Sequence, residues 1–324
     1  MLERTNRTET PKKMEGKESP GIFHASLGFD FIFSRDENNK LHCYCIEING
    51  HDSGVRGVQD IPDDQIDKTH KIVAEIRATV NPEMRRKYGL ANEILHDIHV
   101  TGEFAPSEEG KEKITRYINK SLRTAPTFTH AHHNPDFIED ITRDKRLQEK
   151  YIPKEYQPRI WREGDDPVSS TGRWIVKHFR SRGGDGVHVI PNDQFLEFIA
   201  QNKNEIDKYV VQELLMSSGA QMVPESQGKR AASMRLLMDF RYLDGGTIAP
   251  DFITAYQRVA PYDTDKTKDD EGNKLTWEDA YVVNRARGAT SAAASSEEIT
   301  MAREAAEKII KNIASAYIQG QDSD

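Results

Sequence analysis

The chain of 324 residues has little cysteine and no long apolar run. Its two cysteines, Cys43 and Cys45, have neither the spacing of a zinc-binding CxxC pair nor the number that a disulfide framework needs. No apolar run approaches the roughly 20 residues of a membrane-spanning helix, and no secretory signal is recognisable at the N-terminus. We therefore expect two reduced, buried thiols in a cytoplasmic protein without a membrane partner.

A basic excess is also missing. The 45 lysines and arginines are outnumbered by 53 aspartates and glutamates, which gives a formal net charge of −8. Because a nucleic-acid partner requires a basic face for its phosphates, this balance argues against nucleic acid as a partner. Hydrophobic residues make up 36% of the chain and the mean hydropathy is −0.74, which suits one or two soluble domains with long polar loops.

Two apolar strands near the start of the chain, predicted at residues 27–33 and 40–48, carry acidic residues on one face. If the turn lies midway between them, antiparallel pairing sets Asp30 opposite Glu47, about 5 Å apart at Cβ. Like charges repel at that distance unless a cation lies between them. Asn49 shares the face of Glu47, and together these oxygens form a hard set that suits magnesium. A strand face with solvated acids is the alternative.

Glycines cluster at Gly183, Gly184 and Gly186, between two short apolar strands and just after Lys177. Glycine lets the backbone approach a phosphate closely and point its N–H groups at it. The cluster is neither a Walker A motif, since GxxxxGK[ST] is absent, nor a dinucleotide fingerprint, since no helix follows directly. With the lysine beside it, it predicts a phosphate-binding loop, and an ordinary turn is the alternative.

Together these segments resemble the ATP-grasp superfamily of carboxylate–amine ligases, and look closest to its α-L-glutamate ligase and D-alanine–D-alanine ligase branches. The resemblance covers roughly residues 21–58 and 141–318. It includes Glu-Ile-Asn at 47–49, Val-Val-Gln-Glu-Leu-Leu at 210–215 and Asn-Arg-Ala-Arg-Gly at 284–288. It implies an α+β, ATP-grasp fold in which two lobes clasp ATP.

The resemblance implies ATP and Mg²⁺ as cofactors. Lys145 and Lys177 would neutralise the nucleotide phosphates, and a solvated surface lysine is the alternative for Lys145. The strand with Gln212, Glu213 and Leu215 would present its backbone to the adenine. The metal would be held by Asp30, Glu47 and Asn49.

The family joins a carboxylate substrate to an amine substrate: ATP converts the acid to an acyl phosphate, and the amine displaces phosphate to form an amide. In this chain Arg235 and Arg287 would stabilise the developing negative charge, and Asn284 would orient one of them or reach the metal. Surface ion pairs are the alternative for these arginines. The residues assigned to substrate binding are Ser53, Gly54, Arg56 and Arg258.

Family members ordinarily end with the metal hairpin, whereas this chain begins with it, so the resemblance implies a circularly permuted fold. We then expect the last helix, with its apolar stripe from Ile299 to Tyr317, to pack beside the hairpin. The charged segment 262–279 is predicted to be a lid over the site. The predicted domains are a mobile tail (1–20), the metal hairpin of the large lobe (21–58), a pre-ATP-grasp substrate domain (59–140), the small lobe (141–210) and the rest of the large lobe (211–324).

Two other functions stay open. An ATP-grasp kinase would have the same nucleotide site and differ only in its acceptor, and a regulatory protein would bind ATP without turnover. The histidines His130, His132 and His133 suggest either a zinc site or solvated side chains. The oligomeric state is open as well, with a homodimer as one option.

Overall fold

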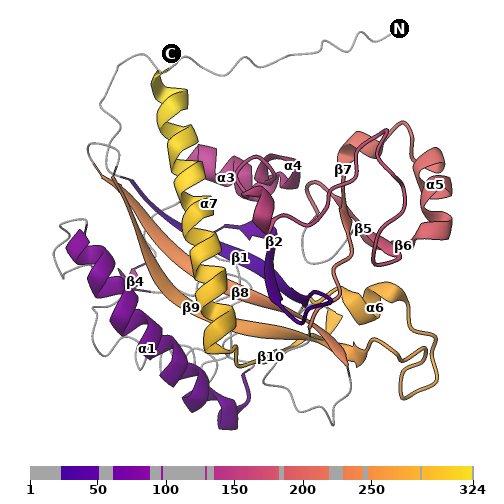
Figure 1. Ribbon diagram of the computed structural model, residues 1–324, viewed down its shortest axis with the longest axis horizontal. Coiled ribbons are helices and arrows are strands. Elements are labelled where there is room, and N and C mark those ends of the chain that lie inside the picture. The colour runs from indigo at the N-terminus through magenta and orange to yellow at the C-terminus, as the bar shows by residue number, and fades with distance from the viewer. Residues whose placement is uncertain are drawn as a thin grey trace, which may run out of the picture.

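A computed structural model gives the fold of the protein as a mixed α+β arrangement with antiparallel sheets (Figure 1). The residues that the structure describes are 23–50, 61–87, 96–97, 128–129, 135–181, 186–218, 229–243, 247–284 and 287–322.

The larger sheet has five strands in the order β10-β9-β8-β1-β2, and every neighbouring pair is antiparallel. The central pair joins β1, near the start of the chain, to β8, about two hundred residues later. Asp30 of β1 lies opposite Arg235 of β8, so the register sets an acid beside a base in the middle of the sheet. The strands are β1 Phe23–Arg35, β2 Leu41–Asn49, β8 Arg230–Leu243, β9 Thr247–Asp263 and β10 Thr290–Ala292.

Two long helices, α1 (Asp63–Lys87) and α7 (Ser296–Asp322), pack on this sheet (Figure 1). Helix α7 begins at a capping box, where the Ser295 hydroxyl donates to the Glu298 carboxylate at 2.8 Å. Its apolar residues recur every three or four positions, so they form one buried stripe. This stripe shares a hydrophobic core with residues of β1 and β2. The expected packing of the last helix beside the hairpin is therefore present, while the permuted chain order stays a prediction.

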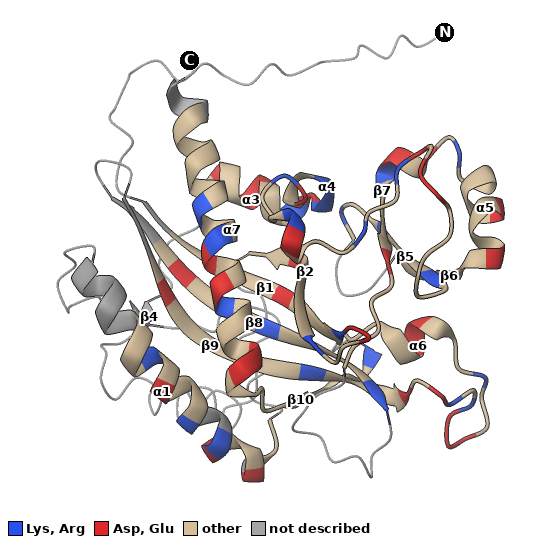
Figure 2. Cartoon of the chain, viewed as in Figure 1, with Lys and Arg blue, Asp and Glu red and all other residues tan. Residues whose placement is uncertain are grey.

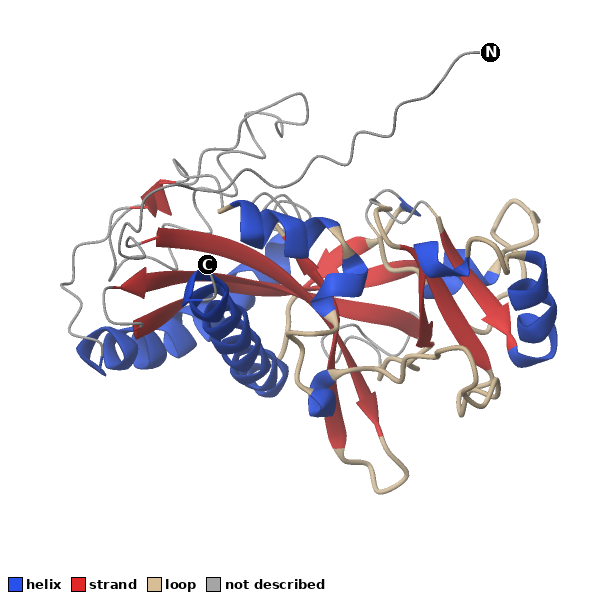
Figure 3. Ribbon diagram, turned by 90° about the horizontal axis from the view of Figure 1, so that it is seen from above, coloured by secondary structure: helices blue, strands red, loops and turns tan. Residues whose placement is uncertain are grey.

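The smaller sheet has three antiparallel strands in the order β6-β5-β7 and lies at one end of the molecule (Figure 3). Trp174 of β5 and Phe195 of helix α5 are fully buried and stack at 5.1 Å between ring centroids. These elements are β5 Arg173–His178, β6 Val187–Pro191, β7 Tyr209–Glu213 and α5 Asn192–Gln201.

The remaining described elements are short. Residues 136–148 form two helices, because Asp144 leaves the helical conformation and caps the second one. They are α3 Asp136–Arg143 and α4 Lys145–Gln148. The others are the 3-10 turns η2 Lys154–Tyr156 and η3 Ile206–Lys208, helix α6 Trp277–Tyr281 and the parallel strands β3 His96–Asp97 and β4 Phe128–Thr129. Among the described helices, none has the length and apolarity to cross a bilayer.

The hairpin of β1 and β2 contains a bulge that the sequence did not predict. Residues 31–35 pair with 45–41, but residues 28–30 pair with 49–47, so Ile46 has no partner in β1. Asp30 lies opposite Glu47 as predicted, but only because the bulge shifts the register by one residue. A bulge re-aims the side chains that follow it. Cys45 and Ile48 are therefore both buried in the core, while Glu47 faces the other side.

Candidate functional site

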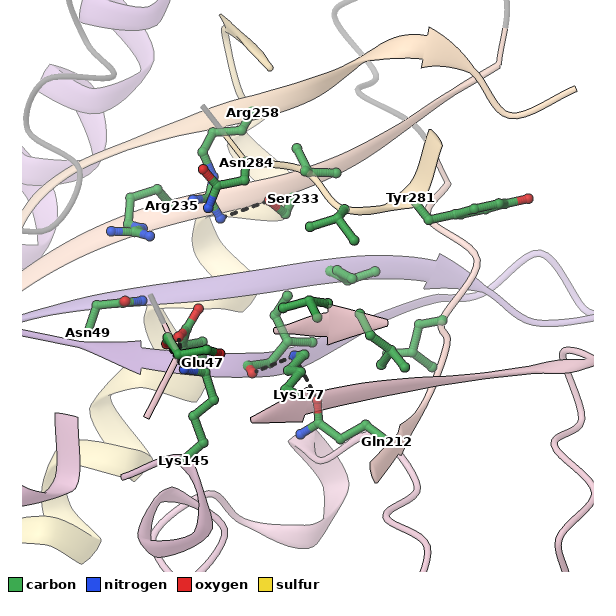
Figure 4. A pocket seen from close by; sticks show the side chains of 18 of the residues that line it. Glu47, Asn49, Lys145, Lys177, Gln212, Ser233, Arg235, Arg258, Tyr281 and Asn284 are labelled. Carbon is green, nitrogen blue, oxygen red and sulfur yellow. Dashed lines mark hydrogen bonds and ion pairs between the residues drawn. The ribbon is translucent and has the colours of Figure 1, made fainter. Parts of the chain in front are cut away.

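A pocket of about 420 Å³ lies between the two sheets (Figure 4). It is lined from the small-sheet side by β5, β6 and β7, and from the large-sheet side by β1, β2, β8 and β9. Most of the predicted site residues that the structure describes meet here: Glu47, Asn49, Lys145, Lys177, Gln212, Glu213, Leu215, Arg235, Arg258 and Asn284.

Lys145 reaches the pocket from the first position of α4. The Asp144 carboxylate accepts from the Arg146 backbone N–H and so fixes the start of this short helix. From there the Lys145 ammonium lies 3.2 Å from the Glu47 carboxylate and donates to the Ser181 carbonyl. A cation and an anion from two distant segments are thereby set side by side at one end of the pocket.

Lys177 extends from β5 into the same end of the pocket and is 7% exposed. It donates to the Gln212 side-chain oxygen at 2.8 Å and to the Ile46 carbonyl at 3.3 Å. Burial, with the nearby Lys145 charge, lowers the pKa of Lys177 to about 8. The lysine is therefore charged at neutral pH yet has few partners, which suits it to an anionic ligand.

The opposite end of the pocket is largely apolar. Ile175 and Val187 of the small sheet line the pocket and belong to one hydrophobic cluster with Tyr281, which lies at the far side from Glu47 (Figure 4). Glu213 lines the pocket, but its carboxylate accepts from the Ser169 hydroxyl at 3.0 Å and the Ser170 N–H. The side chain of Glu213 thus holds a neighbouring loop.

Asp30 is 2% exposed and lies beneath the charged end. One carboxylate oxygen accepts from Arg235 Nε; the other accepts from Arg235 Nη2 at 2.9 Å and lies 2.8 Å from Arg258 Nη2. Burial alone would raise the pKa of Asp30, but the two guanidinium groups outweigh it and hold the pKa below its usual range. Asp30 therefore neutralises the buried Arg235 and the partly buried Arg258.

These contacts test how well the residues fit a magnesium ion. Glu47 and Asn49 present oxygen atoms at the pocket wall and fit as ligands for a hard cation. Asp30 does not fit in this arrangement, because guanidinium groups engage both of its oxygens. Within the described ranges, no group of three or more His, Cys, Asp or Glu side chains is placed to hold a metal. The three-residue metal set therefore stays a prediction, supported for two of its members.

Arg235 and Arg258 stand on neighbouring strands and line the wall across the pocket from the lysines (Figure 4). Arg258 Nη2 also donates to the Ser233 hydroxyl at 3.0 Å. Its buried Nε has no hydrogen-bond partner among the residues described. Basic and acidic residues stand within the strands of the large sheet (Figure 2).

Some predicted residues lie elsewhere. Arg287 is not among the lining residues and lies 3.7 Å from Asp279 instead. Gly186 adopts a positive φ of 64° in the turn before β6 but does not line the pocket. None of residues 262–279 lines it, so the predicted lid does not cover this pocket. Residues outside the described part of the chain are Ser53, Gly54, Arg56, Gly183, Gly184, His130, His132 and His133.

Sequence reasoning missed the contribution of helix α3. Glu139, Thr142 and Arg143 line the pocket, and the Arg143 guanidinium lies 3.2 Å from the Glu139 carboxylate. Their spacing of three and four residues places them on one helix face. Because the same spacing is common on solvent-exposed helices, it did not mark them as site residues.

No protein-family model matches the sequence, and no curated protein matches it. Among solved structures, a glutathione synthetase-like effector from Globodera pallida, in its apo form, is similar over 74% of this chain and 73% of its own. The TM-score is 0.40 and the sequence identity is 11%. A likeness this distant carries no argument about function.

Proposed function

We propose that the chain is an ATP-dependent carboxylate–amine ligase of the ATP-grasp type. One observation carries the proposal: a single pocket between two antiparallel sheets gathers Lys145 and Lys177 on one side and Arg235 and Arg258 on the other. Five basic side chains, Arg143 included, line this cavity against three carboxylates. The excess of positive charge suits a ligand with several negative charges. The resemblance of the sequence motifs to the ATP-grasp superfamily indicates that this ligand is ATP.

The nucleotide would lie along the length of the pocket. Its phosphates would meet Lys145 and Lys177, and its base would lie against the apolar end near Ile175, Val187 and Tyr281. The volume of about 420 Å³ falls within the range that small-molecule sites occupy. Glu47 and Asn49 would hold magnesium, which when bound neutralises charge on the phosphates.

The acid substrate would be bound on the arginine side. Arg258 lines the pocket and its side chain is 12% exposed, so its guanidinium group can meet an anionic oxygen there. Transfer of the γ-phosphoryl group to a carboxylate would give an acyl phosphate and ADP. Attack by an amine would then form the amide and release phosphate. Fixed guanidinium groups stabilise the charge that develops on oxygen in both steps.

The circular permutation, the five domain boundaries, the substrate role of residues 59–140 and the cytoplasmic location belong to the same proposal. The packing of α7 against β1 and β2 supports the permutation, because it brings the last helix to the hairpin that opens the described chain.

ATP-dependent formation of a hydroxamate tests the proposal. The protein is incubated with ATP, Mg²⁺ and hydroxylamine, together with a panel of amino acids and small carboxylates, and Glu47→Ala is the control. We expect one acid to give a hydroxamate that the variant does not form, since hydroxylamine traps an acyl phosphate. A phosphorylated product that is stable to hydroxylamine would instead identify a kinase. ATP binding without turnover on any acid, including peptides, would identify a regulatory protein.

A further inference from the structure

The outer edge of β2 is closed by a buried glutamine. β2 is the last strand of its sheet, so one edge of its backbone faces away from β1. Gln148, at the end of α4, accepts from the Ile48 N–H at 2.8 Å and donates to the Ile48 carbonyl at 2.7 Å. It also donates to the Ile141 carbonyl of α3 at 3.0 Å, and it is 3% exposed. One side chain therefore ties α3, α4 and β2 together.

The same edge is held a second time, two residues earlier, where the Ile46 carbonyl accepts from Lys177. Glu47 lies between these two anchored residues, and Asn49 follows directly. Lys145, whose ammonium faces Glu47, stands three residues before Gln148 in α4. The single turn of α4 thus carries both Lys145, which pairs with Glu47, and Gln148, which holds the backbone of Ile48.

We propose that Gln148 is a positioning residue for the phosphate and metal end of the pocket. It fixes Glu47 and Asn49 on β2 relative to Lys145 on α4, and it does so without touching a ligand. A primary amide suits this role because it offers a donor and an acceptor together and so replaces a neighbouring strand. Without it, the buried N–H and carbonyl of Ile48 lack partners, and the strand shifts to recover them. The inference rests on the proposed nucleotide site.

Gln157 offers a matched control. Its amide also donates to two backbone carbonyls, those of Glu149 and Ile152, but neither belongs to β2. A change at Gln157 therefore removes comparable hydrogen bonds from the same region of the chain without releasing the strand that carries Glu47.

The experiment is calorimetric titration with Mg²⁺ and AMP-PNP, a non-hydrolysable ATP analogue, of the full chain and its variants. We expect Gln148→Met to weaken binding about 10- to 100-fold, the range typical of residues that orient metal ligands. Gln157→Met stays within about twofold of wild type. In a Glu47→Gln background, Gln148→Met should lower the affinity further by only about twofold. The carboxylate that Gln148 positions is already absent there.

Wild-type affinity in Gln148→Met, equal losses in both glutamine variants, or an undiminished loss in the Glu47→Gln background would each overturn the inference. If circular dichroism shows that Gln148→Met does not fold, Gln148→Asn decides. It keeps the amide but is too short to reach both groups of Ile48, so the same loss is expected. A wild-type chain that does not bind the analogue would instead overturn the proposed function, and the inference with it.

Discussion

Asp30 and Glu47 face each other across β1 and β2, yet their surroundings give them different tasks. Asp30 is buried between Arg235 and Arg258, whereas the Glu47 side chain is 28% exposed and has Lys145 as its cation. Removing one member of a buried ionic group leaves uncompensated charge in the interior, whereas a partly exposed pair contributes little. The two acids should therefore differ in what they contribute to stability.

Asp30→Asn is expected to lower the free energy of unfolding by about 3–5 kcal/mol, because it leaves the buried guanidinium group of Arg235 and the partly buried one of Arg258 without a counter-charge. Glu47→Gln is expected to lower it by no more than about 1 kcal/mol. Urea denaturation of both variants measures the difference. Equal losses would show that Asp30 does not serve as the counter-ion of the arginines.

The buried ammonium of Lys177 predicts a pH dependence of nucleotide binding. Its pKa is lowered to about 8, so the charge is present below that pH and is lost above it. Affinity for Mg²⁺ and AMP-PNP should therefore fall between about pH 7.5 and pH 9.5, by at most about tenfold per pH unit. Lys177→Met has no charge to lose, so its affinity should be weaker and flatter across this range. Parallel curves for the two proteins would contradict the prediction.

At the scale of elements, α7 contributes to the core through one face. Ile309 is fully buried among residues of the large sheet, whereas Lys311 on the same helix is exposed. Ile309→Ala should lower the free energy of unfolding by about 2–5 kcal/mol, the cost of an unfilled cavity. Lys311→Ala is the control and should change it by less than about 0.5 kcal/mol. Thermal and urea unfolding check both values, and a similar cost at the two positions would mean that α7 packs differently.

The hairpin of β1 and β2 shows how far a sequence pattern predicts an element. Alternating apolar residues predicted both strands and the turn, since the period of two is local information. The bulge at Ile46 was not predictable, because it depends on which face the core occupies. The arginine partners of Asp30 were also missed, since they come from β8 and β9 and depend on the order of strands in the sheet. Most of the described residues that the motif resemblance named nevertheless line the pocket, because the resemblance encodes that order indirectly.

At the scale of the whole molecule, the proposed permutation makes a prediction about connectivity. Joining Asp324 to Met1 and opening the chain between residues 58 and 59 would restore the family order. The 22 residues before β1 would serve as a linker with a reach of about 70 Å. We expect this rearranged chain to fold and to bind Mg²⁺ and AMP-PNP like wild type. Circular dichroism and calorimetry provide the readouts.

A second opening serves as the control for this rearrangement. Opening the chain between Leu236 and Leu237 would cut β8, a strand paired on both sides, and should prevent folding. If both rearranged chains failed to fold, the chain would not tolerate joining its two ends and reopening after residue 58. The proposed permutation would then lose its support.

The central claim is that the pocket between the two sheets binds the phosphates of ATP. It is tested most directly by calorimetric titration of wild type, Lys145→Met and Lys203→Met with Mg²⁺ and AMP-PNP. Lys203 is an exposed lysine just after α5, beside the smaller sheet, and does not line the pocket. We predict one binding site in wild type, an affinity loss of at least about tenfold in Lys145→Met, as expected for a lost charge-assisted hydrogen bond, and no change in Lys203→Met. Absence of binding in wild type, or equal affinity in all three proteins, would contradict the claim.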